Sequence, residues 1–162
     1  MLRNKLFKKR PHILLIVDVP DWIFHRLAQE IKERLSQTFK FDIKCYTEKY
    51  SEAKYDLIYV LGFNIPIKRP KNPSLYVTGI RSYSWQRKNF DDFIELMNTD
   101  FKAAHCITKD AYSKLHNHIA HLAYIPDGFD YDFFAKARRP KKPKAGKLII
   151  GWAGNRSNPV KG

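Results

Sequence analysis

The last residues of the chain have the composition of a phosphate-binding loop. In the segment GWAGNRSNPVKG, Gly154 and Asn155 can turn backbone N–H groups toward an anion. Arg156 and Lys161 can add positive charge. The spacing matches neither a P-loop nor the GxGxxG dinucleotide motif, so this prediction alone has low specificity.

Two further groups of polar residues follow strand-like apolar runs. Asp18, Pro20, Asp21 and Trp22 come directly after the run ILLIV, at a point where ligands bind in open α/β sheets. The alternative interpretation of these residues is structural, with Asp21 as the N-cap of a helix and Trp22 packed against the body.

In TGIRSYSW, the absence of a side chain at Gly79 permits a close backbone approach, and the Arg81 guanidinium could hold a phosphate or carboxylate bidentately. An ordinary surface arginine is the alternative interpretation.

The segment IPDGFDYDFF predicts a turn at Pro126, Asp127 and Gly128, because proline presets φ and glycine accepts a positive φ. A strand that ends there and is followed by acidic residues, including Asp130, suggests a hinge anchored to the first domain. A plain turn capped by packed aromatic residues explains the same pattern equally well.

Metal and nucleophile chemistry have weaker support in the sequence. His116, His118 and His121 are clustered, but their spacing does not put all three on one helical face, and no Cys or carboxylate completes a zinc set. The serines occur without a nucleophile-elbow motif. We therefore expect no metal site.

Short apolar runs alternate with helical patterns, which predicts an α/β fold with a Rossmann-like, doubly wound parallel sheet. We expect strands at 13–17, 41–46, 55–63, 74–80, 103–109 and 122–126, and helices at 22–38, 91–98 and 110–118. A proline-punctuated basic linker spans 136–147, and 148–162 is the predicted start of a second α/β domain. The predicted domain limits are thus a basic arm at 1–12 and a folded body at 13–135.

The net charge of +14 lies in the flanks of the chain. Residues 1–12 and 136–147 contain five and seven basic residues and no acidic ones, whereas residues 13–135 contain 16 of each sign. A neutral body argues against a nucleic-acid-binding protein. The basic flanks suit an anionic membrane surface, but a solvated tail and linker explain them equally well.

Cys45 and Cys106 lie in apolar, strand-like runs, which favours two buried thiols and a reducing compartment. No apolar run reaches the length of a secretory core or a membrane span. The expected location is cytoplasmic, with peripheral attachment to the inner face of a membrane as a further option.

Several segments, in this order along the chain, resemble the bacterial family 4 glycosyltransferases of GT-B fold. The similar segments are VDVPDW, YDLIYVLGF, CITKDAYSKL, IPDGFDYDFF and the final IIGWAGN followed by KG. The most specific is IPDGFDYDFF, which is similar to the family's IPNGVDTDLF segment at the end of the N-terminal domain.

The resemblance implies transfer of a sugar from a nucleotide-sugar donor to a glycan or lipid-linked acceptor, usually with retention and without an obligatory metal or other cofactor. Gly154, Asn155, Arg156 and Lys161 would contact the donor diphosphate. The acceptor side of the cleft would include Asp18, Pro20, Asp21, Trp22, Arg81 and Ser82. Arg81 and Ser82 stand where many members have a histidine near the sugar.

The paired-glutamate motif of the family lies in a donor domain that these 162 residues do not contain. We therefore expect the 162-residue chain to be inactive alone, and its catalytic residues are not identified by the sequence. The alternative function is a non-catalytic α/β module that binds a glycan, a lipid head group or a partner chain.

Overall fold

Six strands form one parallel sheet, as the alternating apolar pattern predicts. The computed structural model describes residues 10–128. The strands are β1 (His12–Val17), β2 (Lys40–Cys45), β3 (Leu57–Val60), β4 (Tyr76–Ile80), β5 (Ala103–Cys106) and β6 (Leu122–Tyr124). All neighbouring strands pair in parallel, in the order β2-β1-β3-β4-β5-β6.

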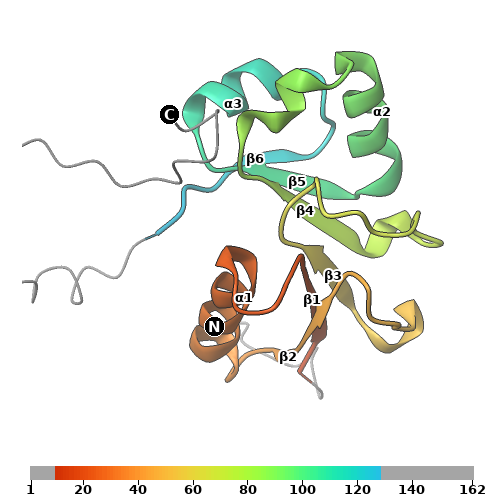
Figure 1. Ribbon diagram of the computed structural model, residues 1–162, viewed down its shortest axis with the longest axis vertical. Helices are drawn as coiled ribbons and strands as arrows, with labels where there is room; N and C mark the ends of the chain where they lie inside the picture. The colour runs from red at the N-terminus through yellow and green to blue at the C-terminus, as the bar shows by residue number, and fades with distance from the viewer. Residues whose placement is uncertain (1–9, 129–162) are drawn as a thin grey trace, which may run out of the picture. The chain divides into compact units, whose positions relative to one another are not determined.

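Three α-helices and three short 3-10 helices connect the strands. The α-helices are α1 (Ile23–Leu35), α2 (Phe90–Asp100) and α3 (Lys109–Leu115), and the 3-10 helices are η1 (Glu52–Lys54), η2 (Pro73–Leu75) and η3 (Tyr83–Arg87). Figure 1 shows α1 beside β1 and β2, and α2 and α3 together at the end of the sheet formed by β5 and β6.

The strand order reverses direction at β1, and this reversal fixes where ligands are expected. Because parallel crossovers are right-handed, the connection from β1 to β2 lies on one face of the sheet and the later connections lie on the other. The fold is therefore a Rossmann-like, doubly wound α/β sheet, as predicted. Its topological switch point lies between the carboxyl ends of β1 and β3.

The sheet is covered on both faces and forms the centre of the core. Because both faces of β1 are buried, its residues 13–17 are apolar without alternation. Leu14, Ile16 and Val17 have no solvent exposure. Cys45 and Cys106 are free thiols; Cys106 is buried as expected, while Cys45 is partly exposed.

Local capping explains where several predicted boundaries differ from the structure. The predicted strand 103–109 ends at Cys106, because the Thr108 side chain accepts a hydrogen bond from the N–H of Ala111 at 3.2 Å and begins α3. Asn89 caps α2 in the same way, so this helix begins before the predicted residue 91. The predicted strand 55–63 is shortened to β3, and η2 replaces the start of the strand predicted at 74–80.

The chain divides into two compact units, residues 1–127 and 128–162. The predicted linker and second domain lie outside the described residues. Among residues 10–128, no helix is long and apolar enough to cross a membrane.

Candidate functional site

The loop after β1 lies at the topological switch point and contains a buried polar atom without a partner. The Oδ1 atom of Asp18 is buried and accepts no hydrogen bond from any described residue. The Asp18 carboxylate lies close enough to Cys45, at the end of β2, to affect its thiol. The pKa of this thiol is raised by burial first, then by the charge of Glu48 and then by that of Asp18. Buried carboxylate oxygens are normally paired, so Oδ1 of Asp18 is an exception within residues 10–128, and a ligand hydroxyl would reach it only after a local movement of this loop.

The same loop presents apolar side chains to solvent. Trp22 is 58% exposed, so the expectation of a packed indole is wrong. Its neighbours Val19 and Ile23 are also exposed, and so is Pro20. The loop thus contains both an exposed indole and a carboxylate oxygen without a described partner, a combination that can bind a ligand with both a hydrophobic face and a hydroxyl group.

Asp21 does not cap α1, contrary to the sequence-based expectation. Its φ of 56° lies in the left-handed region, which costs a non-glycine residue free energy but is tolerated best by Asp and Asn. Its backbone N–H donates to Nδ1 of His25 at 3.1 Å, and Trp22 takes the N-cap position without a side-chain cap. The exposed Asp21 carboxylate lies 3.6 Å from the same His25 nitrogen.

A second cluster surrounds Arg81 just beyond β4. The side chain of Arg81 is 12% exposed, so it is not an ordinary surface arginine. Its Nε donates to the carbonyl of Leu61 and its Nη2 to the hydroxyl of Tyr59, both at 3.0 Å, while Nη1 pairs with Asp127. The sequence predicted that the Arg81 guanidinium holds a phosphate or carboxylate. In the structure, the group that it holds is the carboxylate of Asp127, which a phosphate ligand would have to displace.

Tyr59 and His105 complete this cluster from β3 and β5. The Tyr59 hydroxyl accepts from Arg81 and can therefore donate to Nε2 of His105, which lies 2.6 Å away. Burial and the Arg81 charge, opposed by Asp127 and the backbone of Ile125, lower the pKa of His105 to about 4. The imidazole is therefore neutral near pH 7. If the Tyr59 hydroxyl donates to Nε2, the ring proton lies on Nδ1, a buried atom that has no hydrogen-bond partner among the described residues.

The cluster depends on glycine at position 79. A Cβ atom there would lie 2.9 Å from Nε2 of His105 and 3.0 Å from both Nε of Arg81 and the carbonyl oxygen of Leu61. Gly79 pairs with His105 across β4 and β5, so its missing side chain leaves the space that the imidazole and guanidinium occupy. The close neighbours of Gly79 are thus side chains and backbone of the chain itself, and an approach of a ligand to this glycine stays a prediction.

The segment after β6 contains the predicted hinge. Asp127 is held by Arg81, which ties this segment to the end of β4. The predicted turn with a positive φ at Gly128 is wrong, because Ile125 to Gly128 forms no turn and Gly128 does not have a left-handed φ. The predicted hinge residue Asp130 lies outside the described residues.

Ser82 has a local structural role. Its hydroxyl lies 2.8 Å from the hydroxyl of Ser84 and accepts from the Ser84 N–H as the N-cap of η3. The predicted donor-binding residues Gly154, Asn155, Arg156 and Lys161 lie outside the described residues, so their roles stay predictions.

Tyr59 and His105 are the residues that the sequence analysis missed. Each is a polar residue within an apolar strand, and each lies on the same face of the sheet as Gly79, because paired residues of neighbouring parallel strands share a face. The sequence did contain a sign of this cluster, namely one polar residue inside each of two apolar strands. Recognising that these two residues face each other requires the strand register, which the sequence alone does not give.

The clustered histidines do not form a metal site. His116 Nδ1 lies 3.1 Å from the carbonyls of Tyr112 and Ser113 on its own helix. Within residues 10–128, no three His, Cys, Asp or Glu side chains come together in a way that could hold a metal ion.

Comparison with known proteins gives no match to this chain, whether with protein-family models, with curated proteins or with solved structures.

Proposed function

We propose that this chain provides the acceptor-binding domain of a glycosyltransferase, which transfers a sugar from a nucleotide-sugar donor to a glycan or lipid-linked acceptor. The observation that carries the proposal is the pairing of Asp18 and Trp22 in the loop after β1. Oδ1 of Asp18, which has no partner among the described residues, would accept a sugar hydroxyl once the loop moves to admit the sugar, and the exposed indole of Trp22 can pack against the apolar face of a sugar ring.

The position of this loop also supports the proposal. It follows the first strand at the switch point of a doubly wound sheet, where ligands bind in such folds. It belongs to VDVPDW, one of the segments that resemble the family 4 glycosyltransferases. Asp18 is the acceptor-hydroxyl ligand in this proposal, and Trp22 orients the ring.

Arg81, Tyr59, His105 and Asp127 act as positioning residues in the proposed enzyme. Their hydrogen bonds hold the segment after β6 against the end of β4, and this segment begins the stretch IPDGFDYDFF of the family resemblance. Because Nε2 of His105 is hydrogen-bonded to the Tyr59 hydroxyl, its Nδ1 is buried and Arg81 is paired with Asp127, neither side chain presents a free group to the sugar.

The donor side of the proposal rests on the resemblance alone. Gly154, Asn155, Arg156 and Lys161 would hold the donor diphosphate, with no metal required and with retention at the anomeric carbon. We place the reaction in the cytoplasm, with the basic segments 1–12 and 136–147 drawing the protein to an anionic membrane surface.

A transfer assay tests this proposal on the polypeptide isolated from its native source. The assay supplies labelled nucleotide-sugars one at a time, with membranes and glycans of the same source as acceptors. We expect label to pass to one of these acceptors from one donor. If the polypeptide binds a sugar but transfers label from none of the common nucleotide-sugars, it is a non-catalytic binding module.

Variants then locate the acceptor site. We expect Asp18→Ala to lower kcat/KM by about 10-fold to 100-fold, as loss of a hydrogen bond to a charged group does, and Trp22→Ala by about fivefold. Lys32→Ala, at an exposed position on α1, is the control and should leave kcat/KM unchanged. Wild-type rates in both site variants would contradict the assignment of the loop.

A further inference from the structure

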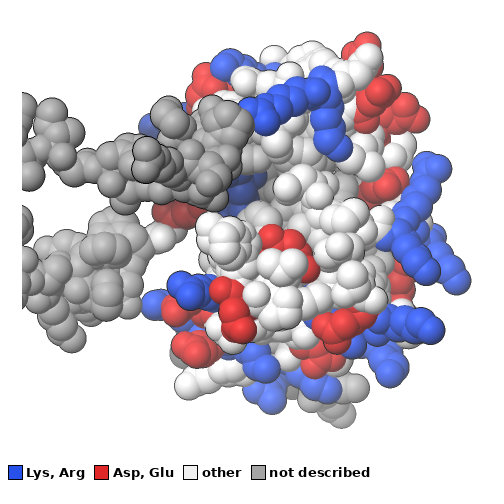
Figure 2. Space-filling model, viewed as in Figure 1, with Lys and Arg blue, Asp and Glu red and all other residues white. Residues whose placement is uncertain are grey.

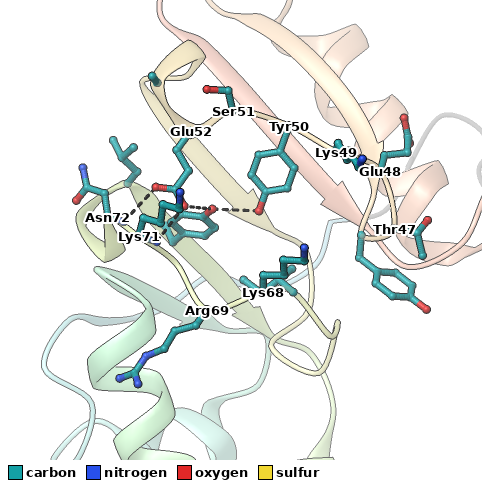
Figure 3. Close-up of a pocket in the computed structure, with 15 residues that line it drawn as sticks. Thr47, Glu48, Lys49, Tyr50, Ser51, Glu52, Lys68, Arg69, Lys71 and Asn72 are labelled. Carbon is teal, nitrogen blue, oxygen red and sulfur yellow. Dashed lines mark hydrogen bonds between the residues drawn. The ribbon is translucent and has the colours of Figure 1, made fainter.

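A cavity of about 850 Å³ lies between the connections that follow β2 and β3. The β2–β3 connection supplies residues 46–53, and Tyr76 lies at the start of β4. The β3–β4 connection supplies Ile67, Lys68, Arg69, Lys71, Asn72 and Leu75. Figure 3 shows these two connections facing each other, with the Tyr50 ring between them. The volume is typical of small-molecule sites, and none of the lining residues belongs to the site proposed above.

Both acidic residues that line the cavity are fully engaged. Oε1 of Glu52 accepts from the Lys71 N–H and the Tyr76 hydroxyl, both at 3.0 Å, and Oε2 accepts from the Asn72 N–H at 3.1 Å. The Cys45 N–H donates to Glu48 at 2.7 Å, and this bond, with Lys44, holds the pKa of Glu48 below its usual value. Each carboxylate therefore already accepts hydrogen bonds from groups of the chain.

The lysines that line the cavity have no such partners. The ammonium groups of Lys49, Lys68 and Lys71 form no ion pair or hydrogen bond with the residues that the structure describes. Arg69 differs, because its Nε lies 3.5 Å from Asp100 and its side chain points away from the Tyr50 ring (Figure 3). In Figure 2, basic side chains gather on the right-hand side of the described body, where Figure 1 draws the β3–β4 connection.

The interior of the cavity is aromatic and apolar. The hydroxyls of Tyr50 and Tyr76 lie 3.0 Å apart and the Tyr76 hydroxyl donates to Glu52, so the two rings are fixed. Burial raises the pKa of both phenols, which keeps them uncharged near pH 7. Ile67 and Leu75 add aliphatic surface.

We propose that this cavity binds a phosphate group carried on a ring or another apolar group. Three ammonium groups that have no partner among residues 10–128 line the cavity and would attract a dianion, because lysine binds phosphate as a point charge. The Tyr50 ring and the aliphatic side chains take up the apolar carrier. The carrier belongs either to a soluble phosphate ester or to an anionic phospholipid.

Phenyl phosphate is a suitable probe, because it combines a dianion with a ring and lacks the groups of a nucleotide-sugar. Its binding to the full chain is followed by backbone NMR shifts, with inorganic phosphate and phenol as the two separated halves. We expect saturable shifts at Lys68, Lys71 and Tyr50, and an affinity for either half at least about tenfold weaker.

A lysine pair tests the charge. Lys68→Ala with Lys71→Ala removes two ammonium groups and keeps the Lys71 N–H that donates to Glu52. We expect about a tenfold or greater loss of phenyl phosphate affinity, whereas the control pair Lys32→Ala with Lys40→Ala, at exposed positions on α1 and β2, should bind as the wild type does. Unchanged thermal unfolding shows that the variants are folded.

Vesicles identify the source of the phosphate. Phosphatidic acid is the phospholipid probe, because its phosphate is a monoester, as in phenyl phosphate. A lipid source is identified if the chain binds phosphatidic acid vesicles, the Lys68/Lys71 double variant weakens this binding and phenyl phosphate competes with it. Saturable phenyl phosphate binding without that competition identifies a soluble ester. Equal affinity in the lysine pair and the wild type, or shifts that fall outside the cavity, would overturn the proposal.

Discussion

Acidification should destabilise this protein through His105. Burial and Arg81 lower the pKa of His105 from 6.5 to about 4 in the folded chain, whereas the unfolded chain keeps the ordinary value. Between these two values the unfolded state binds more protons than the folded state, so stability falls as pH falls through this window. Above pH 6.5 the imidazole is neutral in both states and its contribution to stability is complete.

The size of the effect follows from the shift. At about 1.4 kcal/mol per pKa unit, the full shift would correspond to about 3 kcal/mol. His105 is only partly buried, so solvent screening reduces this figure, and we expect a loss of about 1 to 2 kcal/mol between neutral pH and pH 4.

The assay is urea unfolding at a series of pH values for the wild type and His105→Gln. Glutamine does not titrate and can still accept from the Tyr59 hydroxyl, so the difference between the two curves isolates the imidazole. His121→Gln, at an exposed position, is the control and should follow the wild type. Parallel curves for the wild type and His105→Gln, or an NMR titration of the His105 ring near 6.5, would refute the reasoning.

Three further experiments test the packing at Gly79, the ion pair between Arg81 and Asp127, and the cap of α3. Gly79→Ala should lower the free energy of unfolding by about 1 to 3 kcal/mol in urea titrations, because the new Cβ meets His105 and the Leu61 carbonyl; stability equal to the wild type would contradict the geometry. A double-mutant cycle of Arg81→Gln and Asp127→Asn should give a coupling of about 1 kcal/mol, measured by the same unfolding, and additive effects would show that the ion pair contributes nothing. Thr108→Ala should cost about 1 kcal/mol in the same assay, whereas the control Thr108→Ser keeps the hydroxyl that caps α3 and should stay close to the wild type; equal losses in both variants would show that the cap does not matter.

The sheet was predictable from the sequence because each strand is a separate apolar run. The run of β1 is buried on both faces, and the amphipathic stripe of α1 follows it at once, so the βαβ unit needed no long-range information. The ends of elements were harder to predict, because Thr108 and Asn89 are caps that an apolar pattern does not include.

The candidate site was predicted only in part, because its chemistry depends on contacts between distant segments. The sequence indicated that Asp18 and Trp22 lie at the carboxyl edge of the sheet, but a left-handed Asp21 and an exposed indole follow from the folded loop. Arg81 was predicted to hold an anion, and only the strand register brings Asp127 to it.

The most direct test of the proposed sugar site is an NMR titration of the full chain with methyl glycosides of the common hexoses and N-acetylhexosamines. The indole N–H signal of Trp22, assigned with Trp22→Phe, reports on the loop, and the buried Trp85 is an internal reference. We predict that at least one glycoside shifts the Trp22 signal saturably, leaves Trp85 unchanged and loses its effect in Asp18→Ala. Glycosides that leave Trp22 unmoved, or move it equally in Asp18→Ala, would contradict the assignment of this loop as the acceptor site.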